Sequence, residues 1–369
     1  MSACPTCGEP VSQTDAFCEN CGSTLTVVTT QAATVTVASQ SSPDGEQSAR
    51  THLFTPAGAD NPPAPTATQS ARNPCATCGG EVGGDGYCTV CGIKASNGRE
   101  HVVDQPDPAV AGVSDRGLAH TRNEDAMALA VRAGWSALVV CDGVTTSTDS
   151  DVASLAAATA ARDLHAAAPR PSSGSPAARV THWSEQLKAA AEVAGDAAAK
   201  TSLIAGDTAN PPSCTFVAAV ADGQLIVAGW VGDSRAYWLP DHAVAEQLSV
   251  DDSWATEQIA RGVPREAAEA DPRAHAITKW LGSDSPVVDA STSTTTVVSP
   301  GWLLVCSDGL WNYCSGAADL AELVASQQKS DPAALAEALV AWANEQGGHD
   351  NVTVTLARLA PVPAAEGAS

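Results

Sequence analysis

Two aspartates, each followed by glycine, end two strongly apolar segments of the sequence. Residues 137–144 read ALVVCDGV and deliver Asp142, and residues 301–311 read GWLLVCSDGLW and deliver Asp308. Neither apolar run alternates with polar residues, which predicts strands covered on both faces. A carboxylate at the end of a buried strand is unfavourable unless something pairs it, so one shared polar site is expected. Oxygen ligands of this kind suit magnesium or manganese better than zinc.

Five short acidic segments follow one another along the chain, each beside a predicted strand. Taken singly they have ordinary interpretations, because Asp-Gly is a common turn and GDSR can be a loop closed by an ion pair. Their shared position and fixed order favour a joint role in chemistry. The segments are Asn123-Glu124-Asp125, Asp142-Gly143, Gly232-Asp233-Ser234-Arg235, Ser307-Asp308-Gly309 and Asp350-Asn351.

Eight of the twelve cysteines form two groups of four. In each group, two Cys-x-x-Cys pairs run into glycine, with ten residues between the pairs in the first group and nine in the second. Such pairs aim thiolates at one tetrahedral ion, which predicts two structural zinc sites without an open coordination position. Disulfide pairing is the alternative, and the lack of a secretory signal favours metal. The predicted zinc ligands are Cys4, Cys7, Cys18 and Cys21, then Cys75, Cys78, Cys88 and Cys91.

The composition narrows the classes of partner. Acidic residues outnumber basic ones by 42 to 19, giving a net charge of −23, which argues against a nucleic-acid-binding surface. No stretch approaches 18 consecutive apolar residues, and the first residues resemble no signal peptide, so no membrane partner and a cytoplasmic location are expected.

Changes in texture divide the chain into five parts. We predict a zinc ribbon at 1–22, a disordered linker at 23–73, a second ribbon at 74–95, a larger domain at 105–360 and a disordered tail at 361–369. Within the larger domain, helices are expected at 152–168, 180–200, 317–327 and 332–345, with a helical excursion at 253–280. Apolar segments joined by turns, such as the hairpin predicted in 214–239, indicate antiparallel sheets. The fold class is therefore α+β, with packed sheets and outer helices.

The order and wording of these motifs resemble the bacterial metal-dependent serine/threonine protein phosphatases of type 2C. The resemblance spans about residues 109–359 and implies two packed antiparallel β-sheets flanked by helices. The motifs that carry it are SDRGLAHTRNEDA (114–126), GDSRAYWL (232–239), HAITKWLG (275–282), SDGLW (307–311) and HDNVTVTL (349–356).

The resemblance also implies a metal centre with two ions, manganese or magnesium, and a third weaker site. Asp142 would bridge the two ions, with the Gly143 carbonyl on one and Asp308 and Asp350 on the other. Metal-bound waters would be held by Glu124 and Asp125, and Asp233 would join Asp308 at the third site. A metal-activated water would then hydrolyse phosphoserine or phosphothreonine in protein substrates, among them a cognate kinase or its targets.

Two departures from the family pattern concern the substrate rather than the metals. The loop DGVTTSTDS has Thr145 and Thr146 where the family has a Gly-Gly pair. His120 stands where the family has a phosphate-binding arginine, and Arg122 follows two residues later, so either is a candidate for that role.

Two other functions remain open at this point. The chain could be a pseudophosphatase that acts through its ribbons, or a scaffold that binds partners through the ribbons and the linker. Retention of Asp142, Asp233, Asp308 and Asp350 favours the enzyme.

Overall fold

The computed structural model describes residues 2–3, 10–11, 75, 78–83, 87–93, 98–168, 175–205, 209–285 and 289–361. The first predicted zinc ligands (Cys4, Cys7, Cys18 and Cys21), the predicted linker 23–73 and nearly all of the predicted tail lie outside these residues. Across the described ranges, every helix is too short or too polar to cross a bilayer.

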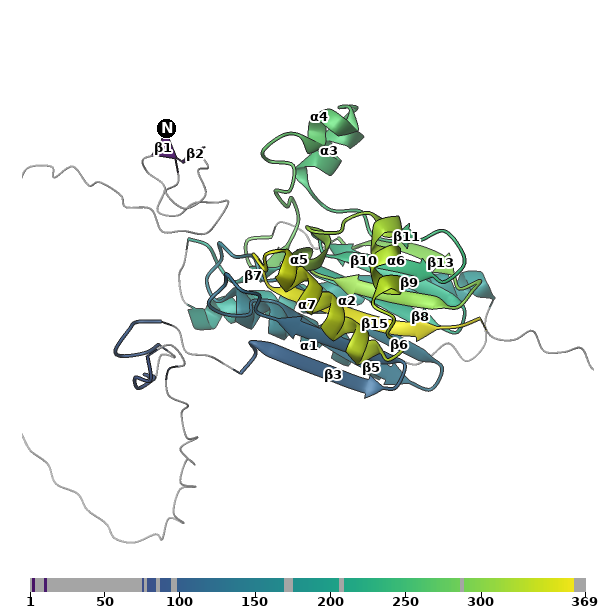
Figure 1. Ribbon diagram of the computed structural model, residues 1–369, viewed down its shortest axis with the longest axis horizontal. Helices are drawn as coiled ribbons and strands as arrows, with labels where there is room; N and C mark the ends of the chain where they lie inside the picture. The colour runs from purple at the N-terminus through teal and green to yellow at the C-terminus, as the bar shows by residue number, and fades with distance from the viewer. Residues whose placement is uncertain are drawn as a thin grey trace, which may run out of the picture.

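Two antiparallel sheets form the centre of the domain (Figure 1). The six-stranded sheet has the order β11 (Glu246–Gln247), β10 (Arg235–Pro240), β14 (Gly301–Cys306), β15 (Val352–Leu359), β4 (Val110–Asp115) and β3 (His101–Asp107). The five-stranded sheet has the order β13 (Ser291–Thr296), β9 (Leu225–Val231), β8 (Phe216–Asp222), β6 (Trp135–Cys141) and β5 (Ala126–Arg132). Two-stranded pairs are formed by β1 (Ser2–Ala3) with β2 (Pro10–Val11) and by β7 (Ser213–Cys214) with β12 (Leu281–Gly282).

Helices cover both outer faces of this sandwich. Helices α1 (Ser150–Ala167) and α2 (Pro176–Ala205) pack on the five-stranded sheet, where small alanines allow close approach. Helices α5 (Asp308–Trp311), α6 (Ala317–Ser326) and α7 (Pro332–Gln346) pack on the six-stranded sheet. The predicted α+β class, with two packed antiparallel sheets flanked by helices, is confirmed.

The position of strand β6 between the outer helices and the other sheet explains why its sequence does not alternate. Val139 and Cys141 face α1 and α2, whereas Leu138 and Val140 face the other sheet. Because both faces meet apolar neighbours, all seven residues are buried, as the sequence predicts. The contacts between sheets are completed by Leu303 of β14, among other apolar residues.

Helices α3 (Trp254–Ala260) and α4 (Arg265–Glu269) stand apart from the sandwich (Figure 1). They share a small apolar cluster of Ala255, Ala268 and Ala274, separate from the main core. The predicted helical excursion over 253–280 is therefore helical only in part, and residues 270–280 lead back towards β12.

Three features of the strands differ from the sequence prediction. Strand β3 begins at His101, four residues before the predicted domain start at 105, and lies at a sheet edge. The segment 214–239 is a β8–β9 hairpin only as far as Val231, because β10 joins the other sheet. Strand β13 (Ser291–Thr296) is a further edge strand, composed entirely of serine and threonine.

Candidate active site

The acidic segments meet because their strands end at the same edge of the sandwich. Asp142 follows β6, and Asp125 precedes β5. The two strands are paired so that Ala126, the first residue of β5, lies opposite Cys141, the last residue of β6. Asp308 follows β14, and Asp350 precedes β15, which pairs with β14. The chain crosses between the sheets at Asp233, between β9 and β10. Segments up to 225 positions apart thus deliver their carboxylates to one place.

Burial and the charges of neighbouring carboxylates raise the pKa values of all five aspartates. Burial raises the pKa of Asp125 to about 6 and that of Asp233 to about 7, and neighbouring carboxylates add to both shifts. Burial, together with the charges of the other four, raises the pKa of Asp142 well above its usual range. The pKa values of Asp308 and Asp350 are also raised, chiefly by burial. Such a cluster cannot ionise fully without cations.

Two glycines permit this close approach. At Gly117, where φ is 70°, a side chain would overlap the carbonyl of Asp350. At Gly309, a side chain would overlap the carbonyl of Asn351. The Asp308-Gly309 motif therefore supplies a carboxylate and leaves room for the neighbouring Asp350-Asn351 segment, which Gly117 also approaches closely.

Asn351 holds the 116–124 loop in place, a role that sequence reasoning missed. Its Oδ1 accepts the backbone N–H of Glu124 at 2.7 Å. Its Nδ2 donates to the carbonyls of Arg116 at 2.8 Å and Arg122 at 3.0 Å. The only sequence signal is its place beside Asp350, and the contacts cross more than 220 positions.

Asn123 and Arg99 anchor the other side of this loop. Asn123 Nδ2 donates to the Arg99 carbonyl at 3.0 Å and to Ser114 Oγ at 2.9 Å. The Arg99 guanidinium donates to the carbonyl of Asp125 and, at 2.6 Å, to that of Asp151. Residues that precede the predicted domain start thus position a candidate metal ligand.

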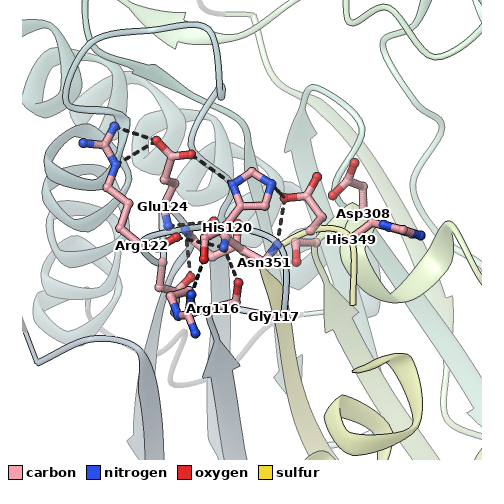
Figure 2. A network of polar contacts seen from close by, with 12 residues as sticks. Arg116, Gly117, His120, Arg122, Glu124, Asp308, His349 and Asn351 are labelled. Atoms are coloured by element: carbon pink, nitrogen blue, oxygen red, sulfur yellow. Dashed lines mark hydrogen bonds and ion pairs between the residues drawn. The ribbon is translucent and has the colours of Figure 1, made fainter. Parts of the chain in front are cut away.

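His120 lies between two acidic residues (Figure 2). Its Nδ1 is 3.7 Å from Glu124 Oε2 and its Nε2 is 3.2 Å from Asp350 Oδ1. The nearby Glu124 carboxylate and the charge of Asp350 raise the pKa of His120 despite its burial. The imidazole therefore links the 116–124 loop to the acidic cluster.

Glu124 and Arg122 form an ion pair beside this histidine (Figure 2). Arg122 donates to Glu124 Oε1 at 3.0 Å from Nε and 2.7 Å from its terminal nitrogen. The same guanidinium is 3.7 Å from Asp151 Oδ1, and Ser150 Oγ donates to Glu124 Oε1. Burial opposes ionisation of Glu124, but its hydrogen bonds and Arg122 outweigh burial and lower its pKa.

The buried oxygens of the acidic cluster fit hard divalent cations. Thr353 donates to Asp125 Oδ2 at 2.8 Å, while Oδ1 is buried and accepts no hydrogen bond from the described residues. The backbone at Asp142 is fixed by Thr215, whose Oγ1 accepts the Asp142 N–H at 3.0 Å. Rigid carboxylates with unused oxygens are the ligands that magnesium and manganese prefer.

The second cysteine group forms a compact cluster of its own. Cys75, Cys78, Cys88 and Cys91 place their sulfurs within 4.8 Å of one another. The Cys75 and Cys91 sulfurs are 3.6 Å apart, and those of Cys78 and Cys88 are 3.4 Å apart. Four converging sulfurs suit a tetrahedral ion such as zinc.

Comparisons with known proteins give matches for the larger domain and for the first cysteine group. Residues 117–356 match the family described as protein phosphatase 2C, and residues 4–25 match a zinc-ribbon domain. The serine/threonine phosphatase stp of Listeria monocytogenes is 34% identical over 149 residues, which are 40% of this chain. The matched region spans 57%, a little over half, of that relative.

Solved structures share the fold over most of the chain. The serine/threonine phosphatase PstP/Ppp of Mycobacterium tuberculosis is 26% identical, with a TM-score of 0.56. The match covers 70% of this chain and 99% of that one. A structure of the PstP catalytic domain in complex with two manganese ions has the same identity and coverage, with a TM-score of 0.53.

Proposed function

The chain belongs to the protein phosphatase 2C family, and on that premise we propose that it hydrolyses phosphoserine and phosphothreonine in proteins at a binuclear manganese or magnesium centre. The observation that carries the proposal is the gathering of five carboxylates at one edge of the sandwich. Burial, together with the charges of neighbouring carboxylates, raises their pKa values, and divalent cations would compensate these charges.

Each residue of the cluster has a proposed role. Asp142 would bridge the two ions and the Gly143 carbonyl would bind one of them, because both lie at the end of the rigid strand β6. Asp308 and Asp350 would hold the other ion. Asp125 would hold metal-bound water through its unused Oδ1. Asp233 would belong to a third, weaker site with Asp308.

The protein residues position the reacting groups, and the bound ions would supply a water of lowered pKa and charge compensation for the phosphate. No nucleophilic side chain is required for such a reaction. Glu124 keeps a low pKa through His120 and Arg122, so it stays ionised and can accept a hydrogen bond from a metal-bound water.

Arg122 is the better candidate than His120 for binding the substrate phosphate. Both ring nitrogens of His120 face carboxylates of the site, because Nε2 lies 3.2 Å from Asp350 Oδ1 and Nδ1 lies 3.7 Å from Glu124 Oε2. Arg122 contacts Glu124 closely, but its Nη1 lies 3.7 Å from Asp151, beyond hydrogen-bond distance. That nitrogen can turn to a phosphate oxygen, which guanidinium groups recognise well. His120 then positions Asp350 and Glu124.

The cysteine groups would each bind one structural zinc ion. Four thiolates close the coordination sphere, so the ribbons would contribute binding or stability and no catalysis. The natural partners would be phosphoserine and phosphothreonine proteins, including a cognate kinase or its substrates.

The test is hydrolysis of an aryl phosphate and of a phosphothreonine peptide by the full chain, with manganese, with magnesium and with a chelator. We expect turnover with either metal and none with the chelator. A protein that binds two manganese ions yet turns over neither substrate would instead support the pseudophosphatase. Binding of the full chain to immobilised phosphopeptides without turnover would support the scaffold function.

A further inference from the structure

A cavity of about 220 Å³ lies beside the acidic cluster. One wall is Val144, two residues after Asp142, and another is Ser213, two residues before Thr215. The walls are joined by the backbone hydrogen bond from Val144 to the Ser213 carbonyl, at 3.0 Å. Because Thr215 also fixes the Asp142 backbone, the cavity has a defined position relative to the reaction site.

The third wall comes from the segment that follows α4. Ile277, Trp280 and Asp284 line the cavity from this segment, and Pro211 also lines it. Trp280 Nε1 donates to Asp284 Oδ1 at 2.9 Å, which fixes the indole and the carboxylate together. The cavity thus combines apolar side chains, an aromatic ring and an exposed carboxylate with four uncharged polar residues, Thr146, Ser147, Asn210 and Ser213.

The size and charge of the cavity restrict the kind of ligand that it could bind. Its volume is below the roughly 300 Å³ at the lower end of small-molecule sites, so it suits a single side chain. The nearby cation Lys279 is 2.7 Å from Asp252, and none of the described basic residues forms an ion pair with Asp284. The chain's net charge of −23 further favours a positive ligand.

We propose that this cavity binds an arginine of the phosphoprotein substrate, a few residues from the phosphorylated serine or threonine. The guanidinium would stack on Trp280 and pair with Asp284, while its methylene groups contact Ile277 and Pro211. This inference rests on the proposed function and adds a substrate class to it. The chain would prefer basic phosphorylation sites, and Asp284 and Trp280 would determine that preference.

The experiment compares phosphothreonine peptides that carry arginine or glutamine at each of about three positions on either side of the phosphothreonine. We expect kcat/KM of the wild-type chain to be ~10-fold higher for arginine at the best position. Asp284→Asn should reduce that ratio ~5-fold, because the amide keeps the bond from Trp280 and loses the charge. Trp280→Leu should bring the arginine-to-glutamine ratio of kcat/KM to about one, and Trp280→Phe should retain part of the preference for arginine.

Matched controls separate this inference from the proposed function. Glu322→Gln makes the same charge change on the exposed surface of α6 and should leave the ratio unchanged. Aryl phosphate turnover should be equal in all these variants, because an aryl phosphate carries no arginine for the cavity to bind. An arginine-to-glutamine ratio near one in the wild type, or one that Asp284→Asn leaves intact, would overturn the inference.

The preference for arginine can also be measured by binding if the chain shows no turnover. If the wild type hydrolysed no phosphoester, the proposed function would fail, and binding of non-hydrolysable phosphonate peptides would be measured instead. An arginine preference in binding that Asp284→Asn removes would support the cavity assignment, and equal binding of both peptides would overturn it.

Discussion

The acidic cluster and the cysteine cluster both gather like-charged ligands, but they do so by different means. The four cysteines come from 17 consecutive residues, 75 to 91, and their sulfurs converge within 4.8 Å. The acidic cluster draws on both sheets and on residues from Asp125 to Asp350. A local, closed site can form within a short segment, whereas the open site exists only once the whole sandwich is folded. Structural and catalytic metal sites are expected to differ in this way.

Removing one carboxylate should have the largest effect on this comparison. Asp308→Asn should lower aryl phosphate turnover at saturating manganese at least ~100-fold, since even the outer-shell partners of metal ligands contribute ~10–100-fold. The same variant should be more stable than wild type without metal, because it lacks a buried carboxylate that its neighbours also repel. It should then gain less stability from manganese.

Turnover and thermal melting with and without manganese check both parts of this prediction. Glu322→Gln on α6 is the matched control for the loss of one negative charge. Wild-type turnover in Asp308→Asn would refute the two-metal assignment.

Cys88→Ser tests whether the cysteine cluster and the acidic cluster are independent of each other. Cys88→Ser should reduce the zinc content from two to about one per chain, because the buried Cys88 sulfur belongs to the second group. Aryl phosphate turnover should be unchanged within about twofold. Elemental analysis and the phosphatase assay measure the two outcomes.

Cys314→Ser is the matched control, since Cys314 is half-buried and lies outside the cluster. Loss of turnover in Cys88→Ser alone would mean that the ribbon supports the catalytic domain, contrary to the expectation.

The start of the catalytic domain gives a sharper test of what the open site requires. A chain beginning at residue 98 keeps Arg99 and strand β3, whereas one beginning at the predicted boundary of 105 loses Arg99 and more than half of β3. The shorter chain should be at least ~2 kcal/mol less stable, because hydrogen bonds to charged groups contribute ~1.5–3 kcal/mol each. Urea unfolding of both chains measures the difference, and equal stabilities would show that Arg99 does not anchor the 116–124 loop.

The sequence predicts the parts of the site that rest on strong local patterns. Strands β6 and β14 are continuous apolar runs, so their ends and the attached Asp142 and Asp308 are evident. Helix α7 is similarly marked by Asp331, which caps it through Ala334, and by Pro332 in its first turn. These patterns suffice for the fold class.

Other parts depend on tertiary contacts that no local pattern reveals. Strand β3, HVVDQPD, contains proline and two aspartates, and most of its residues are exposed, so it lacks the apolar pattern of a strand. At Gly232, where the chain leaves one sheet for the other, φ is 105° and a side chain would overlap Thr215. The hydrogen bonds of Asn351 to the 116–124 loop are likewise visible only in the folded chain.

The smallest expected effect concerns His101, which holds edge strand β3 to its surroundings. Its Nδ1 is 2.7 Å from Asp115 and its Nε2 is 3.2 Å from Glu337 of α7. The hydrogen bond to Asp115, and further the charge and hydrogen bond of Glu337, raise the pKa of His101 above its usual value. A raised pKa stabilises the folded chain fully below the unfolded value of about 6.5, and the contribution disappears as the pH rises through the folded value.

His101→Ala should therefore destabilise the chain more at pH 5.5 than at pH 9. The histidine side chain is 44% exposed, so solvent screening limits the difference to less than about 1 kcal/mol. Urea unfolding at the two pH values measures it, with His242→Ala, an exposed histidine in the turn after β10, as the control. A loss of stability at pH 9 as large as that at pH 5.5 would mean that packing of the ring, rather than its charge, fixes β3. Strand β3 pairs with β4, which leads into the 116–124 loop. That result would therefore also mean that the stability of this sheet edge does not depend on the charges around the acidic cluster.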